Sequence, residues 1–121
     1  MKPAHFSALQ NAKTKLLDNA DFDVFGDGTV VIKSAPGHSP GHQVLLVNLA
    51  TSGPVLLSGD LYHYPEERTL KKVPTTEFDR EQSTASRAAV EAFLTRTHAQ
   101  LWIQHDFNGN SKLKKSPSYY D

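Results

Sequence analysis

The chain has 121 residues, of which 38% are hydrophobic and 21% charged, as in an ordinary globular domain with one modest core. Thirteen basic and thirteen acidic residues cancel, which argues against a nucleic-acid-binding protein, and the absence of cysteine excludes disulfides and thiolate metal sites. The apolar runs are too short to span a bilayer and no signal segment is visible, so we expect a cytoplasmic protein without membrane contact.

The first predicted element is a β-hairpin. Residues 1–19 are mostly polar and predict an irregular or short helical segment. Two β-rich runs, 22–25 and 29–34, then flank a Gly-Asp-Gly turn at 26–28. An Asp-Gly step between such runs is a strong hairpin signal.

Two further strands, 43–49 and 55–57, form a second predicted hairpin after a loop rich in proline and glycine. The first of them is apolar on both faces, which favours a position between two layers. The following stretch, 62–78, is polar and without a clear period, so it predicts a long loop, a kind of segment that is often functional.

The strongest helix signal covers residues 79–97. Asp79 and Gln82 have the spacing of a capping box. The predicted buried face consists of Ala85, Ala89, Ala92, Phe93 and Arg96, widened by Val90 and Leu94. A short strand at 101–103 and a polar tail at 108–121 complete the chain. This order predicts a sheet covered by at least one helix.

Three polar residues, His38, Asp60 and His105, each follow a predicted strand. Residues at strand ends converge on one rim of a sheet, where binding sites of layered folds lie. A carboxylate at the end of a buried strand is costly unless it is paired or bound to a metal. Taken singly, each of the three is as well explained by a turn, a cap or the edge of a core. Together they favour a metal site.

Other residues near these positions give weaker signals. His42 fits either a supporting role behind the metal ligands or a structural role at the start of its strand. Tyr62, His63 and Tyr64 follow Asp60 closely, and a hydroxyl there could hydrogen-bond a developing oxyanion or a leaving group. Aromatic packing under the long loop is the alternative. Asp106 either orients a ligand or caps a turn.

The motifs Pro-Gly-His-Ser-Pro-Gly-His at 36–42, Ser-Gly-Asp at 58–60 and Gln-His-Asp at 104–106 resemble the C-terminal half of the metallo-β-lactamase superfamily. Within that superfamily the likeness is closest to the N-acyl homoserine lactonases. The resemblance implies an α/β (α+β) fold: one half of a four-layer αβ/βα sandwich, with a mixed sheet and helix cover.

The resemblance also implies a two-zinc site. His38 matches a ligand of the first metal, Asp60 the carboxylate that bridges both, and His105 the last ligand of the second. A hydroxide between the metals attacks the lactone carbonyl in that family. The family's proton-donating tyrosine falls at His63, so Tyr62, His63 and Tyr64 are the candidates for that role, beside Asp60 as a catalytic residue.

The family's His-x-His-x-Asp-His motif is absent from the chain, so residues 1–121 are interpreted as a partial domain without its N-terminal half. Three functions stay open: a lactonase-like zinc hydrolase acting on a lactone or ester, a non-catalytic half-domain that binds metal weakly or not at all, and another hydrolase of the superfamily, of the β-lactamase or thioester type.

A lone half-sandwich would expose one apolar sheet face. Candidates for that face or its opposite are Val44, Leu46, Val55 and Leu57. We therefore expect a homodimer or a complementing N-terminal half as partner.

Overall fold

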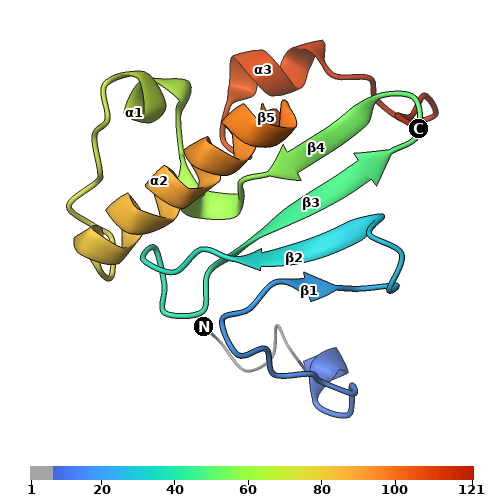
Figure 1. The fold of residues 1–121 in the computed structure, drawn as a ribbon, viewed down its shortest axis with the longest axis horizontal. Coiled ribbons are helices and arrows are strands. Elements are labelled where there is room, and N and C mark those ends of the chain that lie inside the picture. The colour runs from blue at the N-terminus through green and yellow to red at the C-terminus, as the bar shows by residue number, and fades with distance from the viewer. Residues whose placement is uncertain (1–6) are drawn as a thin grey trace.

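Five strands form a single sheet in the order β1-β2-β3-β4-β5 (Figure 1). The fold comes from a computed structural model, which describes residues 7–121. The strands are β1 (Phe22–Asp23), β2 (Val30–Ser34), β3 (Gln43–Leu49), β4 (Gly53–Leu57) and β5 (Gln100–Trp102). Neighbouring strands are antiparallel except β4 and β5, which are parallel because helix α2 (Arg80–Thr97) carries the chain back across the sheet. The predicted mixed sheet with helix cover is confirmed.

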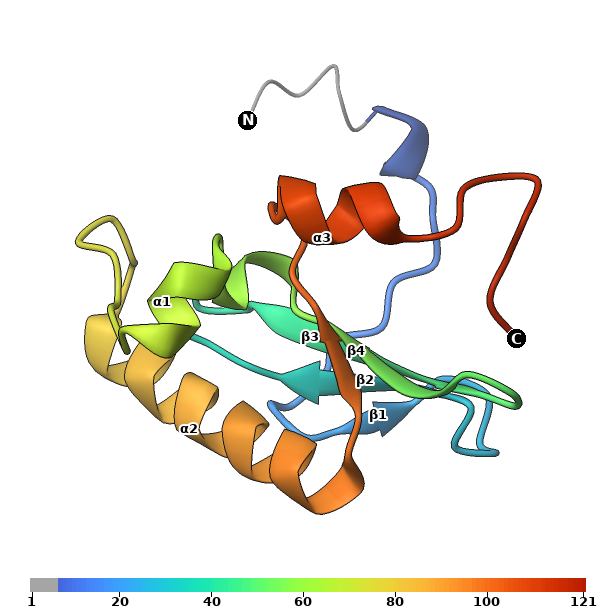
Figure 2. The same cartoon turned by 90° about the horizontal axis from the view of Figure 1, so that it is seen from above.

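Helix α2 covers one face of the sheet, and the core lies between them (Figure 2). Val44 and Leu46 of β3 point to this side, as does Leu56, which is fully buried. From the helix, Val90 and Leu94 pack against them. Burial of these side chains provides the main stabilisation of the layer.

The opposite face is less completely covered. Helix α3 (Phe107–Lys112) and the 3-10 turn at residues 7–9 lie on that side (Figure 2). Leu45, Leu57 and Trp102 are neighbours across β3, β4 and β5 on this face, and each is only partly buried. The Tyr120 ring packs edge-on against Trp102, with 5.0 Å between ring centroids. Leu57 and Val55 are thus on this side of the sheet, with Val55 buried, whereas Val44 and Leu46 are under α2.

The first hairpin differs from its prediction in length. Strand β1 ends at Asp23, so the connection to β2 is longer than the predicted turn. The Asp23 carboxylate accepts hydrogen bonds from the backbone N–H groups of Gly26 (2.9 Å) and Gly28 (2.8 Å). These bonds replace ladder pairing and leave Phe25 71% exposed.

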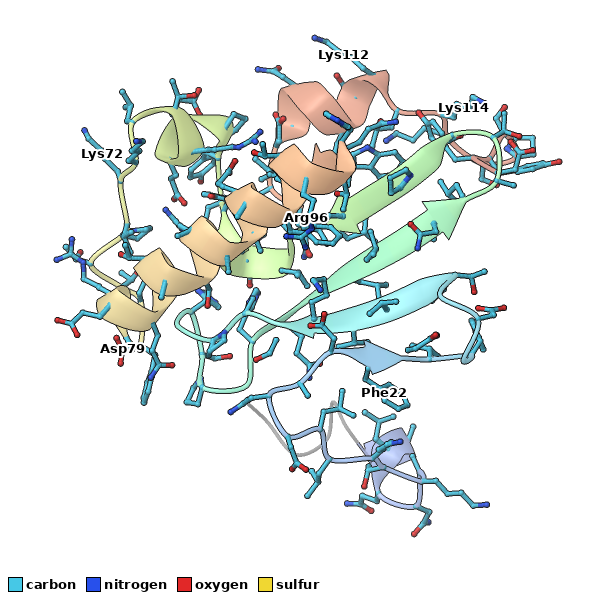
Figure 3. The ribbon with its side chains drawn as sticks, viewed as in Figure 1. Phe22, Lys72, Asp79, Arg96, Lys112 and Lys114 are labelled. Carbon is cyan, nitrogen blue, oxygen red and sulfur yellow. The ribbon has the colours of Figure 1, made fainter. Side chains whose placement is uncertain are left out.

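Helix α2 begins as predicted, at the Asp79 cap, which Figure 3 shows at the N-terminal end of the helix. The Asp79 carboxylate accepts from the N–H groups of Glu81 and Gln82, both at 3.0 Å. In a capping box the Gln82 side chain would also accept a hydrogen bond from the N–H of Asp79. This second bond does not form, because the N–H of Asp79 donates to the carbonyl of Gly37 (2.9 Å).

The predicted buried face of α2 is correct at Val90 and Leu94 and wrong at most of its other positions. Its alanines 85, 89 and 92 are exposed, as is Arg96, and Phe93 is partly buried. The buried residues are Ser83, Ser86, Arg87, Val90 and Leu94. Hydrophobicity could not identify this face. The serines are small enough for the loop at Gly37 to pack closely against the helix, and hydrogen bonds offset the cost of burying Arg87.

Two short helices lie in segments predicted as loop or tail. Helix α1 (Pro65–Thr69) starts with a proline at its first position, where the missing N–H is not needed. Helix α3 is capped by Asp106, whose carboxylate accepts from the N–H of Gly109 at 2.9 Å. Residues 7–9 form a single 3-10 turn, and residues 1–6 of the predicted N-terminal segment lie outside the described residues. Among residues 7–121 there is no helix with the length and apolar character needed to cross a membrane.

Candidate metal site

Three segments meet at one edge of the sheet. Strands β2, β4 and β5 run in the same direction, since β2 and β4 are both antiparallel to β3, and β5 is parallel to β4. Their C-terminal ends therefore lie at the same edge. His38, Asp60 and His105 follow these three ends, so the topology brings together residues that are far apart in the sequence.

The carboxylate of Asp60 lies between the two histidines. Its Oδ1 is 2.9 Å from Nε2 of His105, and its Oδ2 is 3.4 Å from Nε2 of His38. About half of the His105 side chain and about a third of the other two are exposed to solvent. One carboxylate thus presents a different oxygen to each imidazole.

His42 holds the backbone of this edge in place. Its Nε2 accepts a hydrogen bond from the N–H of Asp60 (3.0 Å), so the imidazole proton is on Nδ1, which donates to the carbonyl of Ala35 (2.8 Å). Gly59 has a φ of +51°, and a β-carbon there would be 2.9 Å from Nε2 of His42. A neutral histidine in contact with a glycine therefore fixes the position of Asp60.

The loop that carries His38 is fastened to the first turns of α2. Ser86 donates through its hydroxyl to the carbonyl of Pro36 (2.7 Å), and the N–H of Asp79 donates to that of Gly37. Gly37 has a φ of +135°, and a β-carbon there would be only 2.3 Å from the backbone nitrogen of Ser83. The loop can approach this closely only because residue 37 is glycine.

The three residues after Leu61 that were predicted as proton donors occupy different surroundings. Tyr62 is buried and its hydroxyl donates to Glu91 of α2 (2.9 Å); burial and this bond raise the pKa of Tyr62 well above its usual value. The structure does not bring it to the histidines. The His63 ring is 5.3 Å from that of His38 and stacks on that of His105 at 5.9 Å. Tyr64 is 58% exposed and lines a pocket with His105.

Sequence reasoning missed Glu77. Its Oε1 is 3.5 Å from Nδ1 of His38, and its side chain is only 2% exposed. The other oxygen accepts a hydrogen bond from the Ser83 hydroxyl (2.7 Å). Glu77 precedes the α2 cap within the segment predicted as a loop, and no neighbouring pattern distinguishes it from a solvated glutamate.

The residues around Asp60 have the chemistry of a zinc site. Imidazole nitrogens and carboxylate oxygens are ordinary zinc ligands, and a carboxylate with each oxygen facing a separate histidine suits a bridge between two cations. His38, Asp60 and His105 would provide each of two metals with only two protein ligands. Catalytic zinc usually has three.

Comparison with known proteins shows that the chain belongs to the N-acyl homoserine lactonase family. No protein-family model matches the chain. An N-acyl homoserine lactonase, AttM of Azorhizobium caulinodans, is 36% identical over 107 residues, which are 85% of this chain and 41% of that protein. An N-acyl homoserine lactonase of a Bacillus species is 31% identical over 125 residues, covering 96% of this chain and 50% of that protein.

Comparison of the fold with solved structures also finds a lactone hydrolase. The solved structure of an N-acyl homoserine lactone hydrolase, with N-hexanoyl-L-homoserine at its catalytic metal centre, superposes with a TM-score of 0.74 at 28% identity. The match covers 84% of this chain and 39% of that one. The chain therefore spans half or less of the length of these proteins.

Proposed function

Because this chain is a relative of the N-acyl homoserine lactonases and shares their metallo-β-lactamase fold, we propose that it provides part of a metal site that hydrolyses lactones. The observation that carries the proposal is the Asp60 carboxylate, with one oxygen toward His38 and the other toward His105. Zinc bound there would supply a water molecule with a pKa of about 7, which is a nucleophile at neutral pH.

In this proposal the residues of the chain position the groups of the metal site and balance its charge. Asp60 would contribute negative charge to a metal site, and neutral histidine ligands would leave the site with net positive charge that can polarise a lactone carbonyl. His42 keeps Asp60 in position through its backbone N–H. The leaving alkoxide needs a proton donor. We assign this role to Tyr64, whose side chain is largely free beside His105, because the hydroxyl of Tyr62 is engaged by Glu91.

The ligand count supports a partial-domain interpretation of residues 1–121. Two ligands per metal leave room for a second set of histidines, which we propose comes from a complementing N-terminal half or a second copy of the chain. The partly buried apolar residues Leu45, Leu57 and Trp102 offer that partner a surface.

The test combines the chain with a separately produced N-terminal half of the Bacillus lactonase that carries His-x-His-x-Asp-His. Zinc content and hydrolysis of N-hexanoyl-L-homoserine lactone are measured for the chain, for the half and for the mixture. We expect turnover only in the mixture, and none with Asp60→Asn or His38→Ala. If the chain and the N-terminal half bind each other and zinc but the mixture shows no turnover, the second candidate function, a non-catalytic half-domain, is favoured.

A further inference from the structure

Three buried side-chain atoms among residues 7–121 have no hydrogen-bond partner, and all three belong to one cluster. They are Nδ1 of His38, Nδ1 of His63 and Oε1 of Glu77. One ligand atom from each of these residues lies within 4.8 Å of the others. Buried polar atoms without a partner are costly, so their concentration in one place indicates a missing ligand.

We propose that His38, His63 and Glu77 bind one divalent cation of the zinc class, at a site separate from the Asp60 carboxylate. Two histidines and one glutamate form a common zinc ligand set that leaves a fourth position open. Zinc bonds of about 2.0–2.1 Å put neighbouring ligand atoms about 3.4 Å apart in a tetrahedron. The 3.5 Å between Nδ1 of His38 and Oε1 of Glu77 matches that separation.

The fold holds Glu77 in the orientation that a ligand needs. The Ser83 hydroxyl donates to its Oε2 at 2.7 Å, which leaves Oε1 directed at His38. Ser83 is 2% exposed and lies in the first turns of α2, where Gly37 packs against it. A hydrogen bond to the second carboxylate oxygen is the kind of support that metal-bound carboxylates receive.

His63 is supported by Glu67 of α1, which α2 holds in place through Arg87. Its backbone N–H donates to Oε2 of Glu67 (3.2 Å), and Arg87 of α2 donates to the same oxygen (2.7 Å). Oε1 of Glu67 is 3.3 Å from Nδ1 of His63, so an ion pair with a protonated His63 is the competing arrangement. The geometry favours a cation, because neither histidine Nδ1 makes a hydrogen bond to the glutamate beside it.

The two sites share one imidazole but use different nitrogens. Nε2 of His38 faces Asp60 and its Nδ1 faces Glu77. The Glu77 site draws three ligands from this chain, whereas the Asp60 site draws two per metal. The isolated chain therefore binds its first cation at the site that contains Glu77. This inference stands on residues within the chain and does not depend on lactone hydrolysis.

The experiment titrates the metal-free 121-residue chain with Zn²⁺ by calorimetry and with Co²⁺ by visible absorption. We expect one tightly bound cation per chain and a Co²⁺ spectrum of a four-coordinate site. Glu77→Gln and His63→Ala should each weaken binding more than about 10-fold, whereas the matched variant Glu81→Gln, at an exposed position of α2, should leave it unchanged. Circular dichroism melting of each metal-free variant verifies that it is folded.

No binding by the folded chain would overturn the proposal, as would binding that is lost in Asp60→Asn but kept in Glu77→Gln. Those results leave the lactonase proposal intact, since its own test is turnover in the mixture with the N-terminal half. Conversely, a lack of turnover in the mixture does not contradict the cation site, because the Zn²⁺ titration of the chain alone tests that site.

Discussion

The backbone N–H of Asp60 donates a 3.0 Å hydrogen bond to Nε2 of His42. The same ring donates from Nδ1 to Ala35, so one neutral histidine joins the loop before β3 to the turn after β4. The position of the carboxylate that faces His38 and His105 thus depends on a hydrogen bond to a third histidine.

Replacing His42 by alanine should destabilise the chain by about 1–3 kcal/mol, because the Asp60 N–H and the Ala35 carbonyl both lose a partner. Urea denaturation followed by circular dichroism measures the change. His105→Ala is the matched control, since it removes a histidine whose side chain is about half exposed, and it should cost less than about 0.5 kcal/mol. Equal losses in the two variants would contradict the structural role of His42.

Gly37→Ala should be strongly destabilising, by about 2–4 kcal/mol, because the new β-carbon would be 2.3 Å from the backbone of Ser83 at a φ of +135°. Gly26→Ala is the control: its φ is also positive, at +77°, but no atom lies within 4 Å of the added carbon. It should cost only about 1 kcal/mol. Urea unfolding distinguishes the two, and similar values would show that contact with α2 does not restrict the loop.

The stability that the Tyr62 hydroxyl contributes should decrease at alkaline pH. Burial first, and the hydrogen bond to Glu91 second, raise the pKa of Tyr62 in the folded chain above the unfolded value of about 10. A raised pKa means that the contribution is complete below pH 10 and is lost as the pH rises beyond it, because the unfolded chain releases the proton first.

Tyr62→Phe should therefore lower the free energy of unfolding by about 0.5–1.5 kcal/mol at pH 7, and the difference from the unmodified chain should shrink above pH 10. Thermal melting from pH 7 to 11 measures this. Tyr64→Phe, at a largely exposed position, is the matched control and should change the free energy of unfolding by less than about 0.5 kcal/mol at pH 7. A constant difference across the range would contradict the buried position of the Tyr62 hydroxyl.

The sheet face opposite α2 should mediate self-association of the isolated chain. Leu45, Leu57 and Trp102 are only partly buried there, and burying such a surface is favourable. Light scattering after size exclusion should give a dimer at high concentration, which Leu45→Lys converts to a monomer. Ala89→Lys, on the exposed face of α2, is the control and should not change the mass. A monomeric chain at all concentrations would contradict the prediction.

Local patterns predicted much of this fold. Strand β3 spans the predicted residues, 43–49, and α2 begins at the predicted Asp79 cap, because alternation and capping act within a few residues of the chain. The short helices α1 and α3 were missed, since each lies in a polar segment without a hydrophobic period. The buried face of α2 was predicted only in part, at Val90 and Leu94, because Gly37 and Arg87 make contacts between the helix and loops that are distant in the sequence.

By itself, the sequence determined that His38, Asp60 and His105 follow strand ends, and that the chain resembles one half of a metal-dependent hydrolase. Only the tertiary structure decided that Tyr62 packs into the core while the adjacent His63 meets His38 and Glu77. The directions of neighbouring side chains in a loop depend on the helix that packs against it. That packing brings together residues far apart in the chain, and no local pattern encodes it.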